Sequence, residues 1–477
     1  MKCLKKWIAI TLIMCMTFSM AGCGSSTEHG LSSKKPQSIT IWHYYNGALA
    51  TQFDELVAEF NNTVGKEKGI IVTAESKSSV DDLIAALRDA ADQKVGAPKM
   101  PNIFQCYLDT AMDLDKNDLL ANLDAYVTAD EKAEYMDSYI REGSFGEDNA
   151  FKLFPVAKSS EILMLNKTDW DKFTADTGAT EADLQTWEGL TETAAKYYEW
   201  SDGKAFFGRD AFANYMIVGC EQLGKELFVV DKGKATLQFD KGVVRKLWDN
   251  YYVPYVKGHF VHVGRFRSDD IKLGEIIALV CSTASAVYFP SKVSKTDGST
   301  YDIDYEVLPL PGFAGTDPYA VQQGASMAVT KSTEQAEYAS VVFLKWFTET
   351  EQNMKYCVSS GYLPVKKETN TVEAFDEYCA NAEEALSGIE TDTIHVTLEQ
   401  IAGGEKLYTN SGFDGGTEAR ELLNYGMIDM AVADRANILQ RIQAGEAEEN
   451  VLETYLSDAY FDKWYTQTQA ELEKICQ

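Results

Sequence analysis

The sequence predicts an α/β protein, and three observations lead to that class. Segments with strand-like and helix-like patterns alternate along the chain, as they do when helices cover a sheet. The folded region opens with a strand–helix–strand–helix–strand succession. Of the 477 residues, 45% are hydrophobic and 12% aromatic, which is enough for a sizeable core and argues against disorder. This length allows two or three domains.

The opening succession consists of three strands and two helices. Residues 39–42 and the β-branched run 70–74 predict strands, and residues 102–106 predict a third. Ser79 and Asp82 have the spacing of a capping box and predict the start of the second helix. Because each helix can serve as a crossover, we expect parallel pairing of these strands. The apolar residues with helical spacing are Phe53, Leu56, Val57 and Phe60 in the first helix, and Val80, Leu83, Ile84, Leu87 and Ala91 in the second.

The middle of the chain is more helical. Residues 186–188 predict a helix start, and the helix continues through Leu190, Ala194 and Tyr197. Short apolar runs predict buried strands at residues 276–280 and 326–329. Ser332 and Gln335 form a second capping-box pattern. The helix after it carries Ala336, Ala339, Phe343, Trp346 and Phe347 on one face. The last third has few strand signals and is expected to be mostly helix.

The N-terminus has the pattern of an export signal. Three lysines precede an apolar run at residues 7–18, which is too short to span a bilayer. Residues 20–22 and Cys23 then resemble a bacterial lipobox, in which residues 1–22 are removed and Cys23 receives the lipid. Acyl chains on Cys23 would anchor the protein stably. Residues 23–38 are rich in Ser, Gly and Lys and predict a flexible tether. The alternative is an ordinary signal peptide with a chance cysteine.

Charge and cysteine spacing exclude several kinds of partner and site. The net charge of −29 disfavours nucleic acid and anionic lipid surfaces, although a pocket can still carry its own arginine for a small anion. The cysteines beyond the lipobox show no C-x-x-C spacing, so zinc and thioredoxin-like sites are not indicated. An exported protein can form disulfides, but no pairing is assignable. These cysteines are Cys106, Cys220, Cys281, Cys357, Cys379 and Cys476.

Several segments together resemble the extracellular solute-binding proteins (family 1) of ABC importers, in particular the receptors for oligosaccharides and glycerol 3-phosphate. They occur in the family's order and extend over nearly all of the chain beyond the tether. The segments are ITIWHYYNG (39–47), PNIFQCYLDTA (101–111), FPVAKSSEILMLNK (154–167), TWEGL (186–190), GEIIALVCSTAS (274–285), QQGASMAV (322–329) and GYLPVKK (361–367).

The resemblance implies a two-lobe, periplasmic-binding-protein-like (type II) fold with a hinge and a ligand cleft between the lobes. Residues 39–153 and 309–363 are assigned to lobe 1, and residues 154–308 and 364–477 to lobe 2. The chain then crosses between lobes near Pro155, Pro309 and Pro364, where proline favours an extended segment. The resemblance also implies a monomer that has no cofactor and no metal, touches the membrane only through its lipid, and delivers its solute to the transmembrane subunits of a permease.

Sugar-like ligands require aromatic surfaces and polar groups, and strand-end positions together with the resemblance place ten residues at the cleft, among them Gly324 for close backbone approach. Some follow strand ends, where ligands bind in open α/β sheets. Trp42 could instead be a core residue, and Asp109 could instead cap a helix. The expected ligand-binding residues are Trp42, Tyr44, Asn46, Asp109, Ser159, Ser160, Ser282, Gly324, Tyr362 and Arg420.

The expected ligand is a neutral mono- or oligosaccharide, and two alternatives stay open. Arg420 lies in a region where an arginine contacts phosphate in the glycerol 3-phosphate receptors, so a polyol phosphate is the second candidate. Residues 75–81 lack the tyrosine that those receptors carry. A surface glycan-acting enzyme is the alternative from another class, but no G-x-S-x-G, H-E-x-x-H or phosphate-loop motif occurs. The chain is therefore expected not to be an enzyme.

Overall fold

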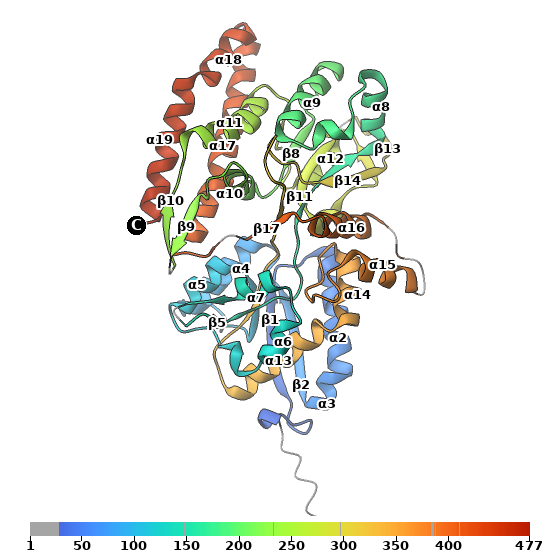
Figure 1. The fold of residues 1–477 in the computed structure, drawn as a ribbon, viewed down its shortest axis with the longest axis vertical. Coiled ribbons are helices and arrows are strands. Elements are labelled where there is room, and N and C mark those ends of the chain that lie inside the picture. The colour runs from blue at the N-terminus through green and yellow to red at the C-terminus, as the bar shows by residue number, and fades with distance from the viewer. Residues whose placement is uncertain are drawn as a thin grey trace, which may run out of the picture.

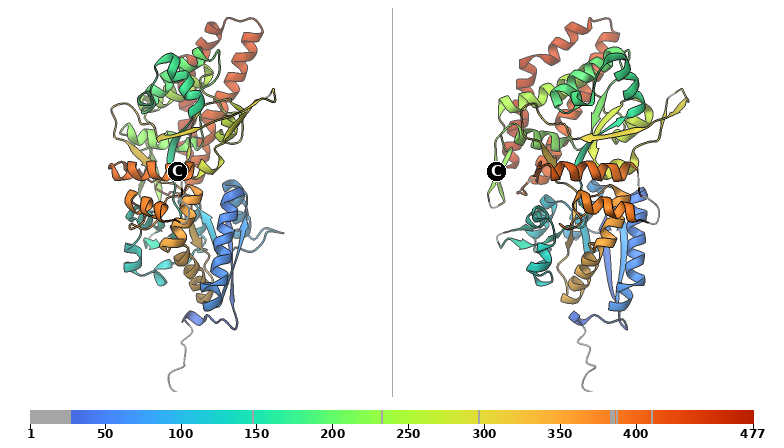
Figure 2. Two further views of the ribbon diagram at one scale, coloured as in Figure 1. Left: turned by 90° about the vertical axis from the view of Figure 1, so that its right-hand side faces the viewer. Right: turned by 45° about the vertical axis from the view of Figure 1, so that its right-hand side comes forward.

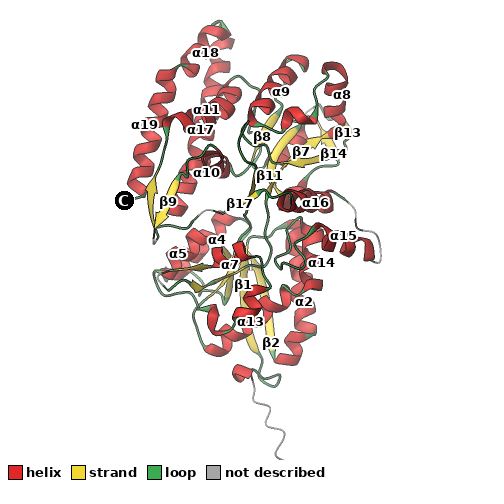
Figure 3. Ribbon diagram, in the orientation of Figure 1, coloured by secondary structure: helices red, strands yellow, loops and turns green. Residues whose placement is uncertain are grey.

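The computed structural model describes residues 28–146, 148–231, 233–295, 297–382, 386, 388–409 and 411–477. The expected signal peptide and residues 23–27 of the expected tether, including Cys23, therefore lie outside the described residues, whereas residues 28–38 of the tether are described and β1 already begins at Gln37. The chain forms two lobes, one above the other, each built around its own sheet (Figures 1 and 2). Figure 3 shows that helices flank the strands of both sheets. The α/β class and the two-lobe fold are both confirmed.

Lobe 1 contains a five-stranded sheet with the order β2-β1-β3-β16-β6. Strand β1 pairs in parallel with β2 and β3, as the opening pattern predicted, and β16 returns antiparallel to β3. Its elements are η1 (Glu28–Gly30), β1 (Gln37–His43), α2 (Gly47–Asn62), α3 (Val64–Lys68), β2 (Ile70–Ser76), α4 (Val80–Ala91), β3 (Ile103–Cys106), α5 (Leu108–Asp115), η2 (Leu123–Ala125), α6 (Ala129–Ala133), α7 (Asp137–Gly143), β4 (Ser144–Phe145), β5 (Ala150–Phe151), β6 (Leu153–Phe154), β16 (Ser326–Val329), α13 (Glu334–Phe347) and α14 (Thr350–Ser360).

Lobe 2 contains a four-stranded sheet with the order β14-β7-β11-β8 and a long helical C-terminal part. Strand β7 is antiparallel to both of its neighbours, and β11 is parallel to β8. Its elements are β7 (Glu161–Asn166), α8 (Lys167–Thr177), η3 (Glu181–Leu184), α9 (Trp187–Trp200), β8 (Phe207–Arg209), α10 (Phe212–Gln222), β9 (Phe228–Asp231), β10 (Lys234–Leu237), α11 (Lys241–Val256), α12 (Arg267–Leu273), β11 (Ala278–Ser282), η4 (Thr283–Tyr288), β12 (Lys292–Ser294), β13 (Thr300–Asp302), β14 (Tyr305–Pro309), α17 (Gly416–Gln443), α18 (Glu448–Leu456) and α19 (Asp458–Ile475).

Four elements lie where the lobes meet. Strands β15 (Tyr319–Val321) and β17 (Lys406–Tyr408) pair in parallel, and helix α15 (Val372–Asn381) packs beside α16 (Ile389–Ala402). Helix α16 contacts α14 of lobe 1 as well as β14 and η4 of lobe 2, so it joins the two lobes. It lies at the level between the two sheets in Figure 1.

Local sequence rules account for most helix starts. Ser79 accepts a hydrogen bond from the backbone N–H of Asp82 at the start of α4, as predicted, and Thr186 caps α9 in the same way. The second predicted capping box is wrong by one residue, because Thr333 rather than Ser332 caps α13. The predicted strand at 276–280 is displaced by two residues to β11, although Ile276 and Ile277 are buried. Burial of apolar side chains alone therefore does not define where the strand begins to pair with its neighbours.

Each lobe has its own main core, although Ala284 of η4 packs in that of lobe 1. In lobe 1, apolar side chains from α2, α13 and α14 pack on β1 and β16, whereas lobe 2 packs α9, α10, α11 and α17 on β7 and β11. The six cysteines beyond the lipobox are unpaired, and four of them are buried among apolar residues. No helix in the described part of the chain combines the length and hydropathy that a bilayer-spanning segment requires.

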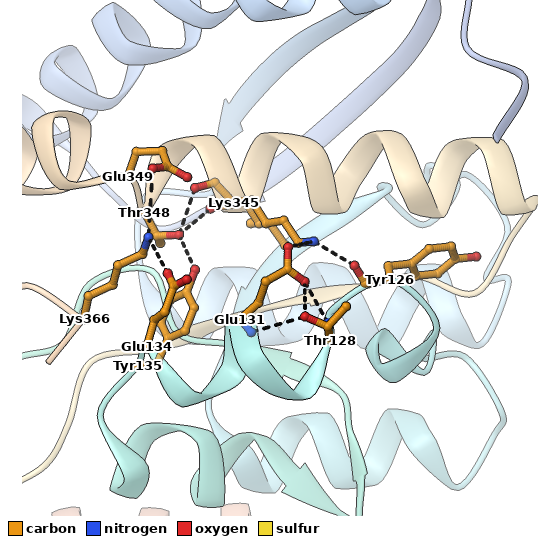
Figure 4. Close-up of polar contacts among 10 residues, drawn as sticks. Tyr126, Thr128, Glu131, Glu134, Tyr135, Lys345, Thr348, Glu349 and Lys366 are labelled. Atoms are coloured by element: carbon orange, nitrogen blue, oxygen red, sulfur yellow. Dashed lines mark hydrogen bonds and ion pairs between the residues drawn. The ribbon is translucent and has the colours of Figure 1, made fainter. Parts of the chain in front are cut away.

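Polar contacts fix the outer edge of lobe 1, as the close-up in Figure 4 shows. Lys345 of α13 donates to the backbone oxygen of Tyr126 at 2.8 Å and pairs with Glu131 of α6 at 2.6 Å. Lys366, beyond α14, pairs with Glu134 at 3.0 Å. The segment that leaves α14 is thereby held against lobe 1 before the chain continues to α15.

Candidate functional site

A cavity of about 300 Å³ lies between the two lobes. From lobe 1 it is lined by the first turns of α4 and α5, by Tyr107 and by Glu142 of α7. From lobe 2 it is lined by the start of α10 and by one face of α17, and the segments next to β15 and β17 close it between the lobes. The lining residues are Val80, Asp81, Ile84, Tyr107, Leu108, Asp109, Thr110, Glu142, Ala211, Ala213, Asn214, Val321, Gln322, Gln323, Tyr408, Thr409, Thr417, Arg420, Glu421, Asn424 and Tyr425.

Two of the ten residues expected from the sequence line this cavity, one from each lobe. Asp109 lies in the first turn of α5 and is only 7% exposed. Burial raises the pKa of the Asp109 carboxyl to about 6, although Arg420 and the Phe413 backbone favour its ionised form. Arg420, in α17, donates to the side-chain oxygen of Asn214 at 2.8 Å. The cavity thus has a carboxylate in one wall and a guanidinium in the other.

Four of the other expected residues are brought together where the chain passes between the lobes. The backbones of Ser159 and Gln323 pair with each other, and a Cβ at Gly324 would lie 2.9 Å from the Ser159 nitrogen. Ser160 accepts from the backbone of Thr283, and Ser282 caps η4 through its side chain. These four residues lie on or beside the crossing segments and are not among the residues that line the cavity.

The remaining four expected residues lie apart from the cavity lining. The Trp42 side chain is 2% exposed in the core of lobe 1, with the Lys77 ammonium 4.0 Å from the centre of its ring. Tyr362 is buried and Tyr44 is half-buried. Burial, together with the interactions among Tyr44, Tyr107 and Tyr362, raises the pKa of all three hydroxyls. Asn46 lies at the surface, where its side-chain oxygen accepts from Tyr288 of lobe 2 at 3.0 Å.

A continuous polar network, which the sequence did not reveal, orients Arg420. Asn214 donates to the side-chain oxygens of Glu161 and Gln323, both at 2.9 Å, while its own oxygen faces Arg420. Glu161 also pairs with Arg209 at 2.9 Å, and both side chains are 1% exposed. Since the Asn214 amide is held at both ends, its oxygen is fixed toward the guanidinium.

The same network extends to lobe 1 through the crossing segments. Lys158, on the first crossing, pairs with Glu142 at 2.8 Å and donates to the Gly324 oxygen at 2.9 Å. Gln322, on the second crossing, donates to Glu142 at 2.5 Å. Residues that line the cavity are therefore linked by hydrogen bonds to two of the three crossing segments.

Several cavity residues were missed by sequence reasoning. Tyr107 directly follows β3 and could have been found by the same strand-end rule that selected Asp109. Gln322 and Gln323 lie beside Gly324, which was selected. Glu142, Asn214 and Tyr408 carry no local signal, because only the tertiary fold brings them to the cavity.

The comparisons with known proteins agree with the fold. The family model described as bacterial extracellular solute-binding protein matches residues 55–383. No curated protein sequence is close enough to count as a relative. Three solved structures of similar fold give the range of identity and coverage.

The cyclic α-maltosyl-1,6-maltose binding protein of Arthrobacter globiformis is 16% identical with a TM-score of 0.61, over 91% of this chain and 99% of its own. UgpB from Mycobacterium tuberculosis, in complex with glycerophosphocholine, is 18% identical with a TM-score of 0.65, over 92% of this chain and 98% of its own. An ABC substrate-binding protein from Listeria monocytogenes, in complex with cycloalternan, is 14% identical with a TM-score of 0.66, over 92% of this chain and 100% of its own. With the family model matching more than half of its length, the chain belongs to the bacterial extracellular solute-binding protein family.

Proposed function

We propose that this solute-binding protein of an ABC importer captures a neutral carbohydrate, a mono- or oligosaccharide, in the cavity between its lobes. A lipid on Cys23 would hold it at the outer face of the cell membrane, and the closed, loaded form would deliver the sugar to the permease. The ligand would be held by Asp109 from lobe 1 and by Arg420 from lobe 2.

The observation that carries the proposal is a set of buried polar atoms that lack a hydrogen-bond partner at the cavity. They are the Asp109 Oδ1 and Gln322 Oε1 atoms and the hydroxyls of Thr409 and Thr417. The Gln322 Oε1 atom can only accept a hydrogen bond, and so can Asp109 Oδ1 while the carboxyl is ionised. The two threonine hydroxyls can donate or accept. Buried polar atoms are normally satisfied, so the cavity suits a ligand that presents several hydroxyl donors. Sugars have this property.

The cavity also offers surfaces for the apolar faces of a sugar ring. Tyr107, Tyr408 and Tyr425 contribute aromatic area, and Val80 and Ile84 of α4 contribute aliphatic area. A volume of about 300 Å³ is at the lower end of the range for ligand pockets. Two of the three similar structures are described as saccharide-binding proteins or complexes, which supports the same ligand class.

A polyol phosphate is the second candidate because Arg420 has Asn214, rather than a carboxylate, as its partner among the described residues. A guanidinium that has no carboxylate partner can bind phosphate through two parallel hydrogen bonds. The opposing observation is the charge of the lining, where Asp81, Asp109, Glu142 and Glu421 surround this one arginine. Four carboxylates disfavour a dianion, so the neutral sugar is preferred.

A thermal-shift screen of purified protein tests the proposal. The panel would contain neutral mono- and oligosaccharides, glycerol 3-phosphate and glycerophosphocholine, and each stabilising compound would be titrated by calorimetry. We expect at least one neutral sugar to stabilise the protein and to be recovered unchanged. Stabilisation by phosphorylated compounds alone would overturn the carbohydrate assignment. Turnover of the bound sugar would favour the enzyme alternative.

A further inference from the structure

The segment that precedes α17 spans the space between the lobes. Phe413 is buried in the lobe 2 core, yet Gly412 and Gly416 on either side of it lie against α5 of lobe 1. A Cβ at position 412 would lie 2.4 Å from the Met112 sulfur and 2.7 Å from Leu108 Cγ. A Cβ at position 416 would lie 2.4 Å from Asp109 Oδ1. Non-bonded carbon atoms prefer about 3.5–4.0 Å, so with a side chain at either position the α5 side chains must shift or the two lobes must separate.

The ion pairs around this segment are exposed by comparison. Lys116 of α5 pairs with Asp414 at 2.9 Å, and the two side chains are 46% and 59% exposed. Arg88 of α4 approaches Glu418 of α17 at 3.4 Å, also at the surface. Exposed ion pairs contribute little to stability. The fit between the lobes here depends instead on how closely the glycine backbone can approach α5.

We propose that Gly412 and Gly416 are positioning residues that set the closest approach of α17 to α5 and so permit the cleft to close. Helix α17 carries Arg420 and α5 carries Asp109, so this distance fixes the separation of the two cavity walls. Glycine is a poor helix former, and its presence at the first position of the 28-residue helix α17 is explained by this approach. The inference concerns closure alone, and it holds whichever solute the cavity takes.

Zero-length carbodiimide cross-linking of the ligand-free protein measures this closure. The reagent activates the Asp414 carboxyl, and the Lys116 amine then forms an amide bond only while the two groups are in contact. The rate of this cross-link, followed by peptide mass spectrometry, reports the closed population even when that population is small. The pair Lys345 and Glu131, at 2.6 Å within lobe 1, provides an internal reference.

Gly416→Ala should slow the Lys116–Asp414 cross-link by about tenfold, in the range expected for over-packing a close contact, and should leave the Lys345–Glu131 reference unchanged. Gly426→Ala in the same helix is the matched control, because its nearest contact would be 3.7 Å away, and it should leave both rates unchanged. Asp109→Ala removes the carboxyl and leaves only the Cβ of residue 109, 3.3 Å from a Cβ at position 416. In that background, Gly416→Ala should have little effect on the Lys116–Asp414 cross-linking rate. An unchanged rate in Gly416→Ala would overturn the inference. So would an equal loss of rate with Asp109→Ala present, because the cause would then be a distorted helix and not contact with α5.

Discussion

Asp109→Asn should make the protein more stable and its binding weaker. In the folded protein burial raises the pKa of Asp109 from 3.8 to about 6. At about 1.4 kcal/mol per pH unit, keeping this carboxylate ionised costs the fold about 3 kcal/mol at neutral pH. Asparagine has nearly the same shape and no charge to desolvate, so the substitution should recover most of that free energy.

The pH dependence gives the sign of the effect. Between about pH 4 and pH 6 the folded state binds more protons at Asp109 than the unfolded state does, so the contribution of Asp109 to stability falls as the pH rises through that window. The advantage of Asp109→Asn should therefore be about 3 kcal/mol at pH 7.5 and should shrink below about 1 kcal/mol at pH 4. Sugar binding should weaken about tenfold or more at pH 7.5, since a charge-assisted acceptor is lost.

Urea unfolding of both proteins at pH 7.5 and pH 4, together with calorimetric titration of a neutral sugar from the screen, measures both effects. If the variant were less stable than the parent at pH 7.5, the proposed cost of burying Asp109 would be refuted. A stability difference that does not change with pH would show that this cost does not come from ionisation. Unchanged sugar affinity would remove Asp109 from the ligand site.

Three further predictions concern the anchor, the network and the hinge. Cys23→Ala should release the protein from membranes, and retention after high-salt washing would contradict the lipobox assignment. Asn214→Ala and Arg420→Ala should each weaken sugar binding. The double variant should lose less binding free energy than the sum of the two single losses, because Asn214 acts by orienting Arg420. Additive losses in calorimetry would contradict this role of the network. Gly324→Ala should destabilise the protein by about 1–3 kcal/mol. The loss should exceed that of Gly178→Ala, because both glycines have positive φ but only Gly324 is crowded, by Ser159. Equal losses of stability in urea unfolding would show that crowding at the crossing is unimportant.

The strands and helices of lobe 1 were predictable because their signals are local. The parallel β1, β2 and β3 follow from three short strand-like runs separated by helices, and Ser79 caps the start of α4. Thr333 rather than Ser332 caps α13, because both residue types can cap a helix and residue type alone does not choose between neighbours.

The site was less predictable because it is assembled by the tertiary fold. Asp109 follows the strand-end rule and lies in the cavity wall, whereas the Trp42 ring is covered by Lys77 and packs in the core. Asn214 is decisive for the orientation of Arg420, yet its partners lie 53, 109 and 206 residues away in sequence. No local pattern in the sequence can reveal contacts of that range.

The central claim is that one sugar is held by both lobes at once. Calorimetric titration of the best neutral sugar from the screen against the parent, Asp109→Ala and Arg420→Ala proteins tests it most directly. One residue lies in each wall of the cavity, so each substitution should weaken binding by about tenfold or more, while both variants remain folded. Full affinity in either variant would contradict capture between the lobes and leave a site on a single lobe.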